Sequence, residues 1–151
     1  MHRVGGLEKD SVTGIVSYDP DNHQRMVELR ARKVESIADD IPLQAVAGPD
    51  TGDVVVLGWG GTYGACRTAA ERCRSEGLSV AHVHLRYLNP LPKNLGEILR
   101  SYRTVLVPEL NMGQLRMMIR AKYLLDARGL NKMMGKPFAV QEIVDKIKEI
   151  L

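Results

Sequence analysis

The stretch Asp53–Gly64 (DVVVLGWGGTYG) constrains the fold of this chain most, because a run of β-branched residues breaks into glycines and then into a helical pattern. The residues from Val54 to Leu57 are apolar without alternation, which is typical of strands covered on both faces in parallel sheets. The glycines that follow let the backbone reach a helix start at little steric cost, leaving N–H groups there. The stretch therefore predicts a strand, a tight turn and the N-terminus of a helix.

The alternation of strand and helix continues along the rest of the chain. Further strands are predicted at 79–85, 104–108 and 127–132, and helices at 62–77, 94–102, 115–122 and 140–151. The helix at 94–102 is expected to begin with Asn94 as its N-cap and to bury Tyr102 on its apolar stripe. This regular alternation predicts an α/β fold with an open, mainly parallel sheet and helices on both faces.

The N-terminal part of the chain has a different pattern. Residues 1–18 show no sustained period and are expected to form a loop, followed by a helix from Asp19-Pro20 to about Ala38. Asp is a favoured N-cap, and Pro suits the first helical position. The helix is charged with a thin apolar stripe, which favours a linker role. We therefore divide the chain into an N-terminal loop and linker helix, 1–42, and an α/β domain, 43–151.

Composition excludes several classes of function. With 21 basic and 18 acidic residues, the 151-residue chain lacks the clustered basic stripe expected for nucleic-acid binding. No stretch approaches the roughly 20 apolar residues of a membrane span, and no signal peptide is visible, so a cytoplasmic protein is expected. The two cysteines, Cys66 and Cys73, share one helical face and are expected to be reduced core thiols.

Candidate site residues follow the predicted strands. In a parallel sheet the loops after the strands meet at one edge, where ligands usually bind. The free amides and dipole of a helix start favour a phosphate or carboxylate there, although the glycines could serve the turn alone. The candidate anion-binding or docking edge comprises Gly60, Gly61, Thr62, Arg86, Asn89, Glu109, Asn111, Gln114, Asn131 and Lys132.

Other sites are disfavoured by the motifs. The stretch beginning Gly58-x-Gly60 departs from the dinucleotide fingerprint at Tyr63, and no acidic residue closes the second strand to hold a ribose. His82 and His84 are two apart on a strand but have no third ligand of matching spacing, so a structural role is expected and no metal site is assigned. The chain carries no recognised nucleophile motif. No catalytic residue is therefore assigned. The methionines at 112, 117 and 118 are expected to pack, although their adaptable side chains also suit a partner surface.

Several stretches in this order resemble one family. They are Gly58-Trp-Gly-Gly-Thr-Tyr-Gly-Ala65, His82-Val-His-Leu-Arg-Tyr-Leu-Asn-Pro-Leu-Pro92, Val107-Pro-Glu-Leu-Asn-Met-Gly-Gln-Leu115 and Asn131-Lys132 followed by Gly135-Lys-Pro-Phe138. Asp19-Pro20 with His23, Met26 and Arg30 is similar to the family's linker helix. The sequence thus resembles the C-terminal part of the alpha subunit of 2-oxoacid:ferredoxin oxidoreductases, most closely the 2-oxoglutarate type.

The resemblance implies a fold and an activity. The fold is a transketolase C-terminal-like domain, a three-layer α/β/α arrangement whose five-stranded sheet has one antiparallel edge strand, here Leu43–Ala47. The complete enzyme converts a 2-oxoacid and coenzyme A to acyl-CoA and CO2 on thiamine diphosphate with Mg, and iron–sulfur clusters pass the electrons to ferredoxin. The implied partners are the remaining alpha-subunit domains and the beta subunit, with ferredoxin and coenzyme A at the level of the complex.

This chain accounts for only part of such an enzyme. It has no Gly-Asp-Gly diphosphate motif and too few cysteines for a cluster, so we expect it to bind none of these cofactors and to be inactive alone, as a fragment or a separately encoded piece. One alternative is a free-standing small-anion or nucleotide-binding α/β domain. Another is the matching domain of a transketolase or deoxyxylulose-phosphate synthase, against which the Leu-Asn-Pro-Leu-Pro stretch argues.

Overall fold

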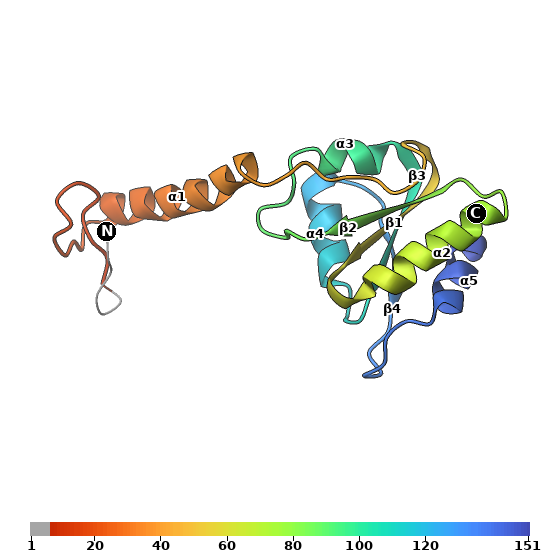
Figure 1. Cartoon of the computed structure of the whole chain (residues 1–151). Helices are drawn as coiled ribbons and strands as arrows, with labels where there is room; N and C mark the ends of the chain where they lie inside the picture. Colours follow the sequence, from red (N-terminus) through yellow and green to blue (C-terminus); the bar gives the residue numbers. More distant parts are fainter. Residues whose placement is uncertain (1–6) are drawn as a thin grey trace. The chain divides into compact units, whose positions relative to one another are not determined.

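The computed structural model describes residues 7–151. The chain forms two compact units, Met1–Ile41 and Pro42–Leu151, which are treated separately. Figure 1 traces both along the sequence.

The first unit is built on one helix. Helix α1 (Pro20–Ser36) begins as predicted, because Asp19 caps it by accepting a hydrogen bond from the N–H of Asp21 at 2.9 Å and Pro20 occupies the first turn. A short 3₁₀ turn, η1 (Ile37–Asp39), follows it. Asn22 is the only residue of this helix that is buried, so the apolar side chains of the helix are not buried within the unit.

The segment before α1 folds back onto the helix. Asn22 accepts a hydrogen bond from the N–H of Ser11 at 3.0 Å and donates to the carbonyl of Lys9 at 3.0 Å. Lys9 also forms an antiparallel bridge with Val16. The segment predicted as loop is therefore a closed turn, which is fixed to α1 by the buried amide of Asn22 and by the ion pair of Glu8 with Arg30.

The second unit is a parallel sheet. Its strands are β1 (Gly52–Trp59), β2 (Val80–Leu85), β3 (Tyr102–Glu109) and β4 (Arg128–Asn131), in the order β2-β1-β3-β4. All three pairings are parallel, and Val56 of β1 lies between His82 and Leu106. The predicted parallel α/β sheet is confirmed.

Helices cover both faces of the sheet, as Figure 1 shows. Helices α3 (Leu95–Arg100) and α4 (Gln114–Tyr123) pack on one face, and α2 (Tyr63–Ser75) and α5 (Val140–Ile150) on the other. Val55 and Leu57 face the α3–α4 side, whereas Val54 and Val56 face the α2–α5 side, which explains the unbroken apolar run of β1. Cys66 and Cys73 are free and buried, as predicted. No helix within residues 7–151 is long and apolar enough to cross a membrane.

The expected antiparallel edge strand is reduced to one bridge. Only Ala47 pairs with β2, exchanging hydrogen bonds with His82 at 2.9 and 3.0 Å. A continued antiparallel register would place Ala45 opposite His84. Instead, the side chain of Asn94 holds the backbone N–H and carbonyl of Gln44 at 2.9 and 3.0 Å, and the sheet has four strands rather than five.

Two local predictions were wrong, and a third holds only in position, because Asn94 is the N-cap residue of α3 as predicted. Asn94 makes no capping bond to α3, because its side chain is committed to Gln44. Tyr102 begins β3 rather than ending a helix, and its hydroxyl donates to the carbonyl of Pro49 at 2.6 Å. The methionines at 112, 117 and 118 are 70%, 56% and 43% exposed, so they are surface residues and not core packing.

Candidate functional site

The predicted edge exists as a row of four loops. Because β1 to β4 are parallel, their carboxyl ends lie at the same edge of the sheet. The strand order places the loop after β1 between the loops after β2 and β3, with the end of β4 outermost. The candidate residues therefore follow the ends of neighbouring strands.

The glycine loop after β1 is a compact 3₁₀ turn, η2 (Gly60–Thr62). Gly60 has φ +57°, a conformation that favours glycine, and both it and Gly61 are exposed with open space around them. Thr62 lies at the N-cap position of α2 without making a capping bond. Its hydroxyl instead accepts from the N–H of Trp59 at 3.2 Å and donates to the Trp59 carbonyl at 2.8 Å, which closes the turn.

The helix start after β3 is already occupied by side chains of its own loop. Glu109 is fully buried and accepts hydrogen bonds from the N–H groups of Leu115 at 2.8 Å and Arg116 at 3.1 Å. Asn111 accepts from the N–H of Gly113 at 2.7 Å. A carboxylate at a helix N-terminus satisfies free amides and complements the dipole. An external anion at this loop would have to displace Glu109.

The loops after β3 and β4 are tied together by polar side chains. Asn131 donates to the carbonyl of Asn111 at 2.9 Å. The Lys132 ammonium forms an ion pair with Glu142 at 2.8 Å and donates to the carbonyl of Pro137 at 3.0 Å. The hydrogen bond from Lys132 also lowers the pKa of Glu142 below its ordinary value. These predicted site residues therefore bond within the domain and hold the loops of the edge in place.

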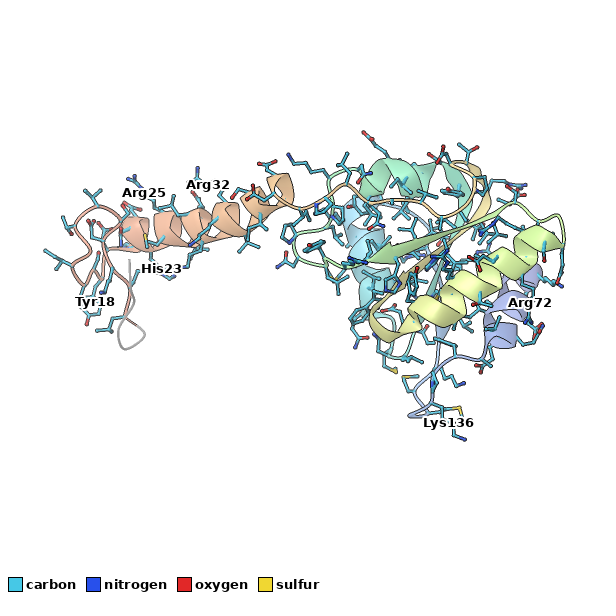
Figure 2. All side chains as sticks on the ribbon, in the orientation of Figure 1. Tyr18, His23, Arg25, Arg32, Arg72 and Lys136 are labelled. Atoms are coloured by element: carbon cyan, nitrogen blue, oxygen red, sulfur yellow. The ribbon has the colours of Figure 1, made fainter. Side chains whose placement is uncertain are left out.

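Apolar side chains are exposed beside this polar row. Leu110 and Met112 follow β3 and are 41% and 70% exposed, and Met133 and Met134 follow β4 at 55% and 72%. Lys136 extends from the loop between β4 and α5, away from the sheet (Figure 2). Exposed methionines adapt their shape readily and are common at surfaces that bind other proteins.

The larger cleft lies elsewhere, along the outer side of β2. It has a volume of about 560 Å3 and is bounded by the irregular segment 42–47 and by side chains from β2, α2 and the loop after β2. Of the ten predicted site residues, only Arg86 lines it. Asn89 lines a second groove of about 380 Å3 with Leu88, Leu91, Met118, Ala121 and Lys122.

Three rings form one wall of the larger cleft. The ring of Tyr63 lies 5.6 Å from that of His82 and 4.9 Å from that of His84, centroid to centroid. His82 is 3% exposed, and burial, reinforced by His84 and Arg67, lowers its pKa to about 4. Burial also lowers the pKa of His84. At neutral pH both imidazoles are therefore uncharged.

The histidine pair was visible in the sequence, but its surroundings were not. His82 and His84 share one face of β2 as their spacing predicts. Tyr63 and the segment 42–47 reach the same cleft only through tertiary structure, and no short motif identifies them. Within the described part of the chain, no three His, Cys, Asp or Glu residues are arranged to hold a metal ion.

Together, the parallel sheet, its paired helix layers and the antiparallel bridge at Ala47 define a transketolase C-terminal-like α/β domain. A solved split-gene transketolase in an inactive beta4 tetramer has this fold, with a TM-score of 0.55 and 19% identity over 71% of this chain and 41% of that one. Residues 52–143 match the family described as pyruvate:ferredoxin oxidoreductase core domain II, and the chain belongs to this family.

Curated relatives of the chain include larger oxidoreductase subunits. The chain is 48% identical over 144 residues to 2-oxoglutarate oxidoreductase subunit KorA of Mycobacterium tuberculosis, covering 94% of this chain and 22% of that protein. It is 30% identical to 2-oxoacid:ferredoxin oxidoreductase 1, subunit alpha, of Aeropyrum pernix, and the match covers 97% of this chain and 24% of that protein. The chain thus spans about a quarter of the length of these relatives. The resemblance inferred from the sequence is confirmed.

A solved relative has the same fold over nearly the whole chain. It is the 2-oxoglutarate:ferredoxin oxidoreductase from Magnetococcus marinus with 2-oxoglutarate, coenzyme A and succinyl-CoA bound. The match has a TM-score of 0.89 and 34% identity, and it covers 99% of this chain and 26% of that one.

Proposed function

We propose that this chain serves as the transketolase C-terminal-like domain of the alpha subunit of a 2-oxoglutarate:ferredoxin oxidoreductase. The observation that carries the proposal is the TM-score of 0.89 over 99% of the chain, at 34% identity, to an oxidoreductase of that name. The complete complex would convert 2-oxoglutarate and coenzyme A to succinyl-CoA and CO2 and pass the electrons to ferredoxin. Thiamine diphosphate, Mg and iron–sulfur clusters would be held by other parts of the complex.

The role of this chain in the complex would be assembly. Three of the polar candidates at the edge, Glu109, Asn111 and Lys132, are engaged in bonds within the domain. Beside them lie the exposed side chains of Met112 and Met134. A rigid polar framework with adaptable apolar side chains around it suits contact with another protein surface. The carboxyl edge would therefore dock against other alpha-subunit domains or the beta subunit in the cytoplasm.

The two parts of the chain would have separate tasks. Residues 1–42 would form the loop and linker helix that join this domain to the rest of the alpha subunit. Residues 43–151 would form the docking domain. Apolar side chains are also exposed in this first part, where Val12, Ile15 and Tyr18 are 77%, 69% and 85% exposed. Their exposure supports a partner surface for residues 1–42 as well.

Association with the missing parts tests this role. The chain would be mixed with the remaining alpha-subunit domains and the beta subunit and analysed by size-exclusion chromatography with light scattering. Co-elution is expected, and Met112→Glu with Met134→Glu should weaken it at least tenfold, because two charges would be desolvated in the interface. The matched control is Thr51→Glu, at an exposed position before β1, at the opposite end of the strands. Failure of the unmodified chain to associate would contradict the proposal.

A further inference from the structure

The cleft along β2 exists because the edge strand is interrupted. The backbone of segment 42–47 pairs with β2 only at Ala47 and His82 and then diverges from the strand. Gln44 reaches the carbonyl of His84 only through its side chain, at 3.2 Å. Asn94 fixes Gln44 in this position with two hydrogen bonds. The opening is therefore held by specific contacts, and its volume of about 560 Å3 lies within the range of small-molecule sites.

Two polar atoms of the cleft-lining histidines, His82 Nε2 and His84 Nδ1, are buried without a hydrogen-bond partner among residues 7–151. His82 lines the cleft at 3% exposure. Buried polar atoms are nearly always paired, so an unpaired one at the wall of a cleft indicates a missing partner. A heterocycle in the cleft can supply a donor or an acceptor, according to the tautomer of the imidazole.

The charge and shape of the lining select an anion with a planar group. Of the residues between 7 and 151 that line the cleft, Arg86 alone is charged at neutral pH, and none is acidic. Among the described residues Arg86 has no ion-pair partner, and its guanidinium is available to a phosphate or carboxylate. Tyr63 is 45% exposed and offers a ring against which a base can stack.

We propose that this cleft binds an adenine nucleotide, with the base against Tyr63 and His82 and the phosphate on Arg86. The ligand is either a free nucleotide or the nucleotide end of a larger cofactor such as coenzyme A. This site is separate from the docking edge that carries the exposed methionines. A negative result for nucleotide binding would therefore not contradict the assembly role, and the reverse also holds.

Titration of the full chain with adenosine 5′-monophosphate, coenzyme A and inorganic phosphate tests the site, by calorimetry and by amide NMR. Saturable binding of the monophosphate is expected, with shifts at His82, His84 and Tyr63. Arg86→Gln should weaken it about tenfold or more through loss of a charge-assisted contact, and Tyr63→Ala about fivefold or more through loss of stacking. Arg103→Gln, a cation at the start of β3, is the matched control and should leave binding unchanged.

The outcomes of these titrations distinguish the two possible ligands and can overturn the proposal. Mutual competition between the monophosphate and coenzyme A supports the nucleotide end of the cofactor as occupant, and binding of the monophosphate alone supports a free nucleotide. The proposal is overturned if no nucleotide binds at about 10 mM. It is also overturned if phosphate competes equally well, if coenzyme A binds without displacement by the monophosphate, or if both folded variants bind normally. Thermal unfolding of each variant confirms that it is folded.

Discussion

The buried carboxylate of Glu109, at the end of β3, accepts a hydrogen bond from the backbone N–H of Leu115, in the first turn of α4, at 2.8 Å. Its second oxygen accepts from the N–H of Arg116 at 3.1 Å. One side chain thus joins a strand end to the helix that follows it. Glu109, predicted as a residue of the anion-binding or docking edge, is therefore a structural cap of α4.

Replacement of this cap should destabilise the domain. Glu109→Gln keeps the shape but places an amide NH2 against a backbone N–H, so one buried donor loses its acceptor. The expected loss is about 1–3 kcal/mol in the free energy of unfolding, measured by urea denaturation. Glu97→Gln, on the exposed side of α3, is the control and should change stability little. An unchanged unfolding midpoint for Glu109→Gln would refute the capping role.

Gly58 should not tolerate a methyl group. An added Cβ would lie 3.0 Å from Thr62 Oγ1, 3.1 Å from His84 Nδ1 and 3.2 Å from Cys66 Sγ. Overpacking of this kind typically costs about 1–3 kcal/mol, so Gly58→Ala should lower the melting temperature. Gly64→Ala meets nothing within 4 Å and lies in α2, so it should be neutral or slightly stabilising. Equal melting temperatures for the two variants would contradict the close approach.

The buried histidine makes stability depend on pH. The pKa of His82 is about 4 in the folded chain, against an ordinary value of 6.5, chiefly because burial disfavours its charged form. The unfolded chain therefore binds this proton first, and stability falls as pH drops from 6.5 toward 4, by about 3 kcal/mol at most. The slope of unfolding free energy against pH should decrease in His82→Leu. An NMR titration of His82 with a midpoint near 6.5 would contradict this prediction.

In the first unit, Glu8 should titrate far below its ordinary range. Arg30 donates to both its oxygens at 3.1 and 3.2 Å and, with a further bond from His23, lowers the pKa of Glu8 from 4.5 to about 2. Any stability from this carboxylate is present above pH 4.5 and is lost as pH falls toward 2. In Arg30→Gln the pKa of Glu8, followed by side-chain NMR, should rise toward 4.5, whereas Arg32→Gln should leave it in place.

Elements whose signal is local were predictable from the sequence. The apolar run of β1, the Asp19-Pro20 start of α1 and the alternation of strands and helices each arise from residues next to one another in the chain. Together they were sufficient for the parallel sheet and for the set of loops at its carboxyl edge. The family resemblance added the antiparallel segment.

Features that depend on distant residues were not predictable. Asn94 and Gln44 are fifty positions apart, and their bonds interrupt the edge strand that the sequence suggested. Glu109 was a candidate site residue because a sequence does not reveal that a carboxylate turns toward the amides of its own loop. The cleft along β2 was missed for the same reason, since its walls come from separate segments.

The proposed function makes this chain a working part of a 2-oxoglutarate:ferredoxin oxidoreductase. Its most direct test is the rate of 2-oxoglutarate- and coenzyme A-dependent ferredoxin reduction by the remaining alpha-subunit domains and the beta subunit, with and without this chain. Full activity is expected only when the chain is present, and no activity is expected from the chain alone. Equal rates with and without the chain would contradict the proposed function.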